Sequence, residues 1–223
     1  MLIKKNIIDF KKNIDNSTIL VAVSKTKPIA DIKEAYDAGH RAFGENKVQE
    51  MVNKYEVLPK DIEWHMIGHM QSNKIKYMAS FVHLIHGVDS IKTLKEINKQ
   101  AKKHDRIISC LLQVKIAKEE TKFGLSFKET ESLINSEVID TLQNVKIAGL
   151  MGMASFTSNE NQIEDEFASL RSLFDKLKEI EKKNIKLEIL SMGMSGDYKI
   201  ALENGSNMIR VGSAIFGARN YIA

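Results

Sequence analysis

The amino-acid sequence predicts an α/β fold, a single (β/α)8 TIM barrel with an extra N-terminal helix. Strand-like and helix-like segments alternate along the whole chain, as is typical of parallel α/β folds. Eight such pairs can be counted in 223 residues, which is enough for a compact barrel. No low-complexity tract or Gly/Ser-rich linker interrupts the chain. We therefore expect residues 1–223 to form one domain.

The predicted strands are short apolar runs rich in β-branched residues, which strands favour. The run over 107–114 is almost entirely apolar, as expected for a parallel strand covered on both faces. In chain order the predicted strands are 19–23, 41–44, 64–67, 83–86, 107–114, 146–151, 187–190 and 208–211.

The predicted helices are recognised by apolar residues that step by three and four. The longest is expected over 162–183, where Phe167, Leu170, Phe174, Leu177 and Ile180 form one stripe. The extra N-terminal helix lies before residue 16. The others follow the strands, at 29–38, 48–55, around 75–78, from 90 to 101, near 128–134 and at 198–202.

An open doubly wound sheet is the competing fold. It would normally have a glycine-rich turn after its first strand, and residues 24–27 contain no glycine. The barrel is therefore favoured over the open sheet.

The composition is typical of a cytoplasmic globular protein. Cys110 is the one cysteine, so no intrachain disulfide can form and a reducing compartment is expected. No apolar run approaches the roughly 18 residues of a membrane span, and the first residues do not resemble a secretory signal. The 33 basic and 29 acidic residues are spread along the chain, and aromatic residues make up 7%. Nucleic-acid binding is therefore not expected.

Two glycine-rich loops predict a phosphate site. They cover 191–197 and 212–217, directly after the seventh and eighth predicted strands, where barrels of this class often bind phosphate. Small residues let backbone N–H groups approach an anion, and Ser195 and Ser213 add hydroxyl groups. Either loop alone would be read as a tight turn. The two together favour an anion site.

Two basic residues lie near these loops, one just after the first predicted strand and one within the eighth. Lys25 follows the first strand on the same side as Val21 and Val23, so it would lie over the barrel mouth if that row faces inward. A partly buried lysine there can act as a Schiff-base nucleophile, and Lys27, further along, is the weaker candidate. Arg210 is expected to face the mouth and a ligand. An ion pair with Glu45 or Asp89 is the alternative left open for it.

No metal site is expected. His65 and His69 have the spacing of a zinc motif, but the sequence around them is not helical and no glutamate follows His65. His83 and His86 differ by an odd number, so on one strand they would point to opposite faces. Cys110 lies in an apolar run and is interpreted as a small buried hydrophobic residue.

Five separated motifs together suggest a family. They are AVSKTKP at 22–28, FGEN at 43–46, WHMIG at 64–68 with QSNK at 71–74, LSMGMS at 190–195, and RVGSAIFG at 210–217. In this order, over nearly the whole chain, they resemble the motifs of the pyridoxal phosphate homeostasis proteins. The sequence departs from the family motifs at two places. Lys47 stands where the family commonly has a tyrosine, and His69-Met70 stands where it commonly has proline-leucine. The role of Lys47 and His69 is therefore left open.

The resemblance implies a barrel like that of the alanine racemases, with pyridoxal 5′-phosphate (PLP) held as a Schiff base on Lys25. It implies that Arg210 faces the pyridine nitrogen and that Asn46 and Met192 line the cofactor. The phosphate would be held by Ser195, Gly212, Ser213 and the backbone of Met194. The complete set of implied cofactor-binding residues is Lys25, Asn46, Met192, Met194, Ser195, Arg210, Gly212 and Ser213.

The function expected from these residues is binding and transfer of PLP without robust catalysis. A permanently charged guanidinium at the ring nitrogen would leave that nitrogen unprotonated, and the chain ends just after the last βα unit. PLP-dependent apo-enzymes or PLP-synthesising enzymes are the expected partners, and a monomer is expected. Two alternatives stay open: a PLP-dependent amino-acid racemase, and a sugar-phosphate enzyme that uses Lys25 as an aldolase-type amine.

Overall fold

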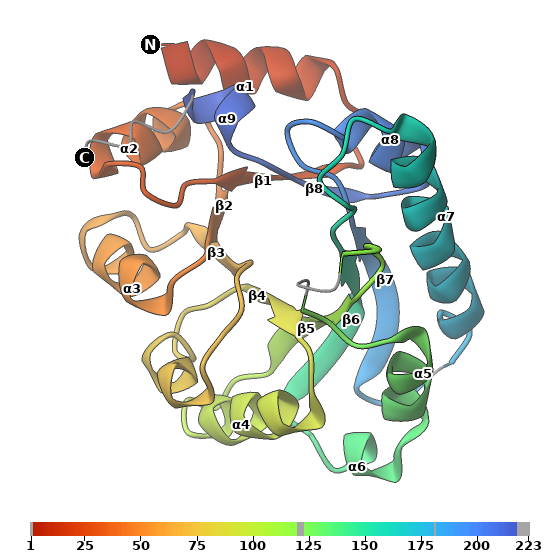
Figure 1. Ribbon diagram of the computed structural model, residues 1–223. Coiled ribbons are helices and arrows are strands. Elements are labelled where there is room, and N and C mark those ends of the chain that lie inside the picture. The colour runs from red at the N-terminus through yellow and green to blue at the C-terminus, as the bar shows by residue number, and fades with distance from the viewer. Residues whose placement is uncertain (1, 120–122, 181, 218–223) are drawn as a thin grey trace.

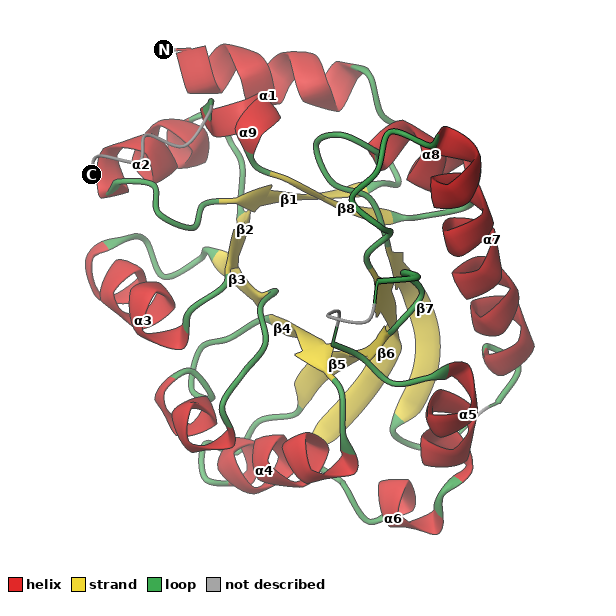
Figure 2. Ribbon diagram, in the orientation of Figure 1, coloured by secondary structure: helices red, strands yellow, loops and turns green. Residues whose placement is uncertain are grey.

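The computed structural model describes residues 2–119, 123–180 and 182–217, and it confirms the predicted barrel. Eight parallel strands form a closed barrel in chain order, β1 to β8, and helices surround it (Figures 1 and 2). The strands are β1 (Ile19–Val23), β2 (Ala42–Glu45), β3 (Glu63–Met66), β4 (Leu84–Val88), β5 (Ile108–Val114), β6 (Val145–Gly152), β7 (Ile185–Ser191) and β8 (Met208–Val211).

The helices follow the strands around the outside of the barrel (Figure 2). They are α1 (Leu2–Lys12), α2 (Ile29–Asp37), α3 (Val48–Val57), the 3-10 helix η1 (Ser72–Tyr77), α4 (Ile91–Lys102), α5 (Phe127–Asn135), α6 (Glu137–Asp140), α7 (Glu160–Leu177), α8 (Tyr198–Glu203) and α9 (Ser213–Phe216). The extra helix α1 lies beside α9 (Figure 1). There the Asn6 side-chain amide donates a hydrogen bond to the Ile215 carbonyl, at 2.8 Å.

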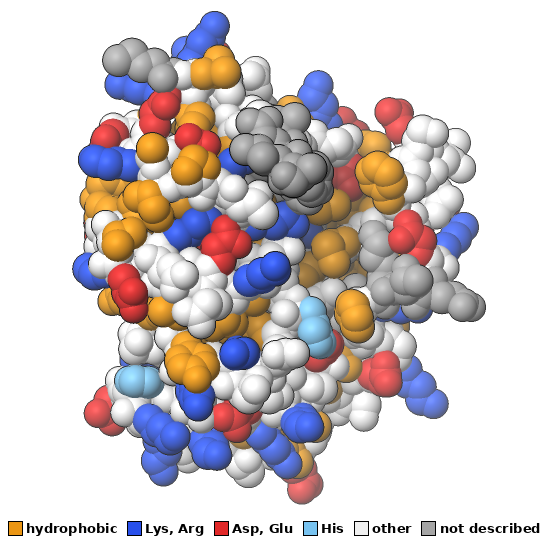
Figure 3. Space-filling model, turned by 60° about the vertical axis from the view of Figure 1, so that its left-hand side comes forward, with side chains coloured by type: hydrophobic (Ala, Val, Ile, Leu, Met, Phe, Trp, Pro, Cys, Tyr) orange, Lys and Arg blue, Asp and Glu red, His pale blue; other side chains and the backbone are white. Residues whose placement is uncertain are grey.

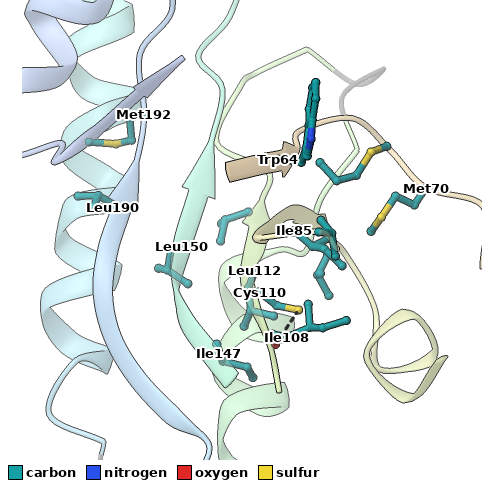
Figure 4. Close-up of a cluster of buried hydrophobic side chains, with 14 of the residues drawn as sticks. Trp64, Met70, Ile85, Ile108, Cys110, Leu112, Ile147, Leu150, Leu190 and Met192 are labelled. Atoms are coloured by element: carbon teal, nitrogen blue, oxygen red, sulfur yellow. Dashed lines mark hydrogen bonds between the residues drawn. The ribbon is translucent and has the colours of Figure 1, made fainter. Parts of the chain in front are cut away.

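Buried side chains form two groups on either side of the strands. The smaller group fills the barrel interior and includes Val21, Leu84 and Met208. The larger group lies between the strands and the helices; part of it is drawn in Figure 4, where Trp64, Ile85 and Leu150 are labelled. Each fully buried large apolar side chain contributes about 1.5–3 kcal/mol. Cys110 is buried in this larger group, as predicted.

Several helices begin at side chains that accept backbone N–H groups. Ser126 accepts the N–H of Glu129, and the Glu129 carboxylate accepts the N–H of Ser126, which forms a capping box at the start of α5. Ser90 accepts the N–H of Thr93 at the start of α4. Each such cap stabilises its helix by about 1 kcal/mol, so these serines determine where the helices begin.

Several details of the predicted helices differ from the structure. The helix predicted over 162–183 ends at Leu177, and α7 starts at Glu160. Ile180 continues the apolar spacing, but it packs on the core from a turn in which its N–H donates to the Leu177 carbonyl. The short helix α6 was not predicted, and the helix predicted around 75–78 is a 3-10 helix over Ser72–Tyr77.

Two surface properties bear on the expected class of protein. Within the described part of the chain, no helix is both long and apolar enough to cross a membrane. Basic and acidic side chains are interspersed over the face drawn in Figure 3, as expected of helices coated with lysine and glutamate.

Candidate functional site

The predicted cofactor residues lie at the C-terminal ends of β1, β2, β7 and β8. Strands β1 and β8 are neighbours, with Val21 opposite Arg210. Val21 belongs to the group that fills the barrel interior, so the row containing Val21, Val23 and Lys25 faces inward, as the parity argument requires. Lys25 is half-buried and follows β1 by two residues. Strand parity therefore still predicts that its side chain points toward the mouth of the barrel.

The two glycine-rich loops meet at this mouth. The Gly212 N–H donates to the Ser195 hydroxyl over 3.3 Å, which joins the loop after β7 to the loop after β8. Gly212 also lies against the end of β1, because a Cβ at this position would be 3.3 Å from the Val23 Cβ and carbonyl oxygen. Ser213 is exposed beside it at the start of α9. The structure thus brings Ser195, Gly212 and Ser213 together next to the end of the Lys25 strand.

Asp197 is a residue of this mouth that sequence reasoning missed. Its carboxylate accepts the N–H of Met194 at 2.5 Å, and Met194 is one of the predicted phosphate residues. An anion that binds the Met194 N–H must therefore replace the Asp197 carboxylate. The only signal in the sequence was an acidic residue within a loop predicted to hold phosphate.

Arg210 lies inside the barrel behind these loops and is 3% exposed. Its guanidinium donates to the Ser191 carbonyl at 2.9 Å, the Ser191 hydroxyl at 2.6 Å and the Gly152 carbonyl at 3.0 Å. Burial lowers the pKa of Arg210 to about 10, and the Asp197 charge opposes this shift. The side chain therefore stays charged at neutral pH. These bonds account for three of its five N–H donors, so others remain for a ligand.

The ion pair that the sequence left open for Arg210 is absent from the described part of the chain. Glu45 pairs with Lys54 at 2.8 Å, and Asp89 lies 3.2 Å from His69 Nδ1. Arg210 instead satisfies backbone and hydroxyl oxygens, as its hydrogen bonds above show. Its described hydrogen bonds therefore go to neutral oxygens and not to a carboxylate.

A chain of buried polar side chains connects Arg210 across the barrel to β4 and β3. Ser191 Oγ lies 3.4 Å from His86 Nδ1, and His86 Nε2 lies 2.9 Å from His65 Nδ1. Burial lowers the pKa of His65 to about 3 and that of His86 well below its usual value. Both rings are therefore neutral at pH 7. Sequence reasoning considered these histidines only as metal ligands and missed the chain.

A buried lysine beneath the Lys25 turn was also missed. Lys54 on α3 is 5% exposed, and its Nζ donates to the Glu45 carboxylate at 2.8 Å, the Glu50 carboxylate at 2.7 Å and the Ser24 carbonyl at 2.8 Å. The Ser24 hydroxyl donates to the same Glu45 oxygen at 2.5 Å. Lys54 thus ties the ends of β1 and β2 to α3.

The cluster of Ser24, Glu45, Glu50 and Lys54 also holds the turn that contains Lys25 and Thr26. Thr26, the residue after Lys25, has a φ of 63°, a conformation that L-residues adopt only when the surrounding structure holds them in it. Its N–H donates to the Glu50 carboxylate at 2.6 Å. Burial raises the pKa of Glu45 to about 7 against the opposing effect of the Lys54 ammonium. We infer that Lys54 and Glu50 position Lys25.

The remaining predicted residues lie in two environments. Asn46 is half-buried directly after β2, at the mouth. Met192 is fully buried among apolar side chains of the larger core group (Figure 4), so a role for its side chain at the cofactor stays a prediction. Of the two departures from the family motifs, Lys47 is exposed at the start of α3, and His69 stacks on Phe123 with ring centroids 4.9 Å apart.

Replacing Gly68 by alanine is expected to displace Asn46 and weaken ligand binding at the mouth. A Cβ on Gly68 would lie 2.4 Å from the Asn46 carbonyl oxygen and 2.8 Å from its Cα, and backbone cannot yield as a side chain can. We expect a loss of about 1–3 kcal/mol in the free energy of unfolding, measured by urea titration. Gly196→Ala is the matched control, because nothing lies within 4 Å of its added Cβ. Equal stability of the two variants would contradict this packing.

The comparisons with known proteins agree with the motifs. The family model for the alanine racemase N-terminal domain matches residues 2–220. A pyridoxal phosphate homeostasis protein of Aquifex aeolicus is 39% identical over 93% of this chain and 90% of its own length. The one of Pasteurella multocida is 36% identical over 99% of both chains.

Solved structures show the same relationship. PipY of Synechococcus elongatus PCC7942 with PLP bound has a TM-score of 0.86 and 34% identity, and the match covers 96% of this chain and all of PipY. An alanine racemase of Clostridium difficile 630 has a TM-score of 0.78 at 12% identity, and the match covers 58% of the racemase; it shows the fold alone. By its sequence and its barrel, the chain belongs to the pyridoxal phosphate homeostasis protein family, within the alanine racemase N-terminal domain family.

Proposed function

We propose that this protein binds PLP at the C-terminal mouth of its barrel, attached through the Lys25 amine, and maintains the supply of PLP inside the cell. The observation that carries the proposal is the meeting of three features at one place. Lys25 lies on an inward-facing row, the Ser195–Gly212 contact joins the two glycine-rich loops, and the buried Arg210 lies next to the same strand.

The donor set fits the chemistry of PLP. An aldehyde needs a primary amine, which Lys25 provides by forming a carbon–nitrogen double bond with loss of water. A phosphate needs N–H and O–H donors in a loop that allows close approach, which Ser195, Gly212 and Ser213 provide. A pyridine nitrogen needs one hydrogen-bond donor, and Arg210 has donors beyond those it uses on Ser191 and Gly152.

The identity of the ring partner favours a carrier over a catalyst. When bound, PLP supplies an electrophilic carbon and an electron-withdrawing ring, which stabilises carbanions best when its nitrogen is protonated. Arg210 remains charged at neutral pH and offers only donors, so it cannot hold a proton on that nitrogen. The relatives that share the motifs are named pyridoxal phosphate homeostasis proteins, which supports the same choice.

The proposal extends to how the protein works in the cell. We propose a cytoplasmic monomer that passes PLP to PLP-dependent apo-enzymes or receives it from PLP-synthesising enzymes. The reaction of an amine with an aldehyde is reversible, so Lys25 can hold PLP covalently and still release it.

Replacing Lys25 by alanine is expected to abolish the visible absorption of lysine-bound PLP. Purified protein is titrated with PLP, and the absorption spectrum is recorded before and after removal of unbound ligand by gel filtration. Lys27→Ala is the matched control, since Lys27 lies two residues further on and donates to the Phe216 and Gly217 carbonyls. Absorption that survives in Lys25→Ala, or that is lost equally in Lys27→Ala, would overturn the assignment.

The racemase alternative is supported by the fold that the chain shares with alanine racemases. The PLP-loaded protein is incubated with L-alanine, and D-alanine is measured by chiral chromatography. The carrier proposal expects no turnover near the enzymatic range of about 1–10³ per second. Turnover in that range would replace it with the racemase.

A further inference from the structure

We propose that the opposite, N-terminal end of the barrel holds a divalent transition-metal ion of the zinc type, bound by Glu63, His65 and His83. Glu63 and His83 lie where their strands begin, away from the mouth, and His65 is buried next to them. Glu63 is the first residue of β3, His65 follows on the same strand, and His83 immediately precedes β4.

The three side chains converge on one point. Glu63 and His65 are two residues apart on one strand, which places their side chains on the same side. The His83 N–H donates to the Trp64 carbonyl at 2.9 Å, which places His83 beside them. One potential ligand atom from each residue lies within 4.8 Å of those from the other two. The ring centroids of His65 and His83 are 5.4 Å apart.

An unpartnered nitrogen is the second observation that points to an ion. His65 is 1% exposed, and its Nδ1 contacts His86 Nε2 at 2.9 Å. Within the described residues, His65 Nε2 is buried without any hydrogen-bond partner. Such atoms are rare in folded proteins. Because Nδ1 is already engaged, Nε2 is the nitrogen that His65 offers to the cluster.

The contact with His86 also suits the tautomer that binds a metal. When His65 Nδ1–H donates to His86, Nε2 carries a lone pair, and metal-binding histidines commonly donate their other N–H in this way. A bound cation would therefore satisfy a buried nitrogen that otherwise lacks a partner.

The donor set selects the class of ion. Two imidazoles and one carboxylate, with a fourth position open to water, form a common zinc set. Imidazole ligands suit Zn²⁺, Co²⁺ and Ni²⁺, whereas Mg²⁺ and Ca²⁺ prefer oxygen donors only. His65 is fixed by burial, and Glu63 and His83 are exposed, so the latter two can rotate to close on the ion.

The sequence-based expectation of no metal site considered other pairs. It compared His65 with His69 and His83 with His86. In the structure His65 lies between them, with His86 on one side and His83 and Glu63 on the other. Glu63 was not considered, because it begins a strand and resembles an ordinary surface glutamate.

The test is a titration of metal-free protein with Co²⁺, followed by Zn²⁺. We expect one Co²⁺ per chain with the intense visible absorption of a four-coordinate site, displaced by an equimolar amount of Zn²⁺. Glu63→Gln and His83→Ala should each weaken Zn²⁺ binding by at least about tenfold. His104→Ala and Glu56→Gln are matched surface controls, both exposed, and should bind as the parent does. Circular dichroism confirms that each variant is folded.

A second readout reports on His65 itself. Nitrogen-15 NMR of the imidazoles distinguishes a lone pair on Nε2 from a metal-bound Nε2, and the largest changes on addition of Zn²⁺ should be those of His65 and His83. No stoichiometric binding, or binding that Glu63→Gln and His83→Ala leave unchanged, would overturn the proposal.

Discussion

Lowering the pH from 7.5 to 5.0 is expected to reduce the free energy of unfolding by about 4 kcal/mol. Burial lowers the pKa of His40 to about 4, that of His65 to about 3 and that of His86 well below its usual value. In the unfolded chain each histidine titrates near pH 6.5. The stability due to a lowered pKa is present above the unfolded pKa and is lost as the pH falls toward the folded one. At pH 5.0 the loss is about 2 kcal/mol per histidine.

Glu45 acts in the opposite direction. Its pKa is raised to about 7, so its contribution is largest below about pH 4.5 and is lost as the pH rises through 7. Acidification from pH 7.5 to 5.0 therefore restores about 2 kcal/mol. Because a protein domain is stable by only about 5–15 kcal/mol, the net loss of about 4 kcal/mol is a large fraction of the total.

Urea titrations at pH 7.5, 6.5 and 5.0 measure this dependence. His40→Gln keeps a donor for the Ala42 carbonyl, which His40 Nε2 contacts at 2.8 Å, and should lessen the loss by about 2 kcal/mol. His104→Gln changes an exposed histidine and should leave the profile of the parent unchanged. A stability that does not vary between pH 7.5 and 5.0 would show that these histidines are not held neutral.

Replacing Lys54 by methionine is expected to cost about 3–5 kcal/mol, the usual result of breaking a buried ion pair from one side. Glu45 is fully buried, and in the variant its carboxylate would lose Lys54, the cation with which it pairs. The Ser24 carbonyl and Glu50 would lose the same donor. Since Glu50 also holds the Thr26 N–H, we expect the turn that carries Lys25 to loosen and PLP attachment to slow.

Urea unfolding and the rate of PLP attachment measure the two effects of Lys54→Met. The double variant Lys54→Met, Glu45→Gln should recover part of the stability, because the uncharged amide in place of the buried Glu45 carboxyl needs no cationic partner. Lys33→Met is the matched control; Lys33 forms an exposed pair with Asp37 at 3.2 Å, of the kind that contributes under about 1 kcal/mol. A loss in Lys54→Met no greater than in Lys33→Met would refute a structural role for the cluster.

The fold was predictable because barrel architecture repeats a local signal. Each strand is an apolar run of suitable length. An error of one or two residues in the bounds of a strand does not alter the alternation of strands and helices. The end of α7 was not predictable in the same way. Ile180 has helical spacing but reaches the core from a turn, and spacing alone cannot distinguish a buried turn from a further turn of helix.

The mouth was predictable where chemistry and strand ends coincide. Lys25 and the two glycine-rich loops follow directly from the position of β1, β7 and β8. The role of Lys54 could not be predicted, because a lysine on a helix next to a glutamate usually forms a solvated surface pair. The chain from Arg210 through Ser191 and His86 depends on the register between β4, β7 and β8 across the barrel, which no local pattern encodes.

The central claim is that Lys25 holds PLP covalently, and one measurement tests residue and ligand together. The PLP-loaded protein is treated with borohydride, which reduces the carbon–nitrogen double bond to a stable amine, and the digested peptides are analysed by mass spectrometry. We predict a single modified peptide containing Lys25, with the mass of a pyridoxyl phosphate adduct. An unmodified Lys25, or a sugar adduct on it in protein purified from cells, would contradict the account.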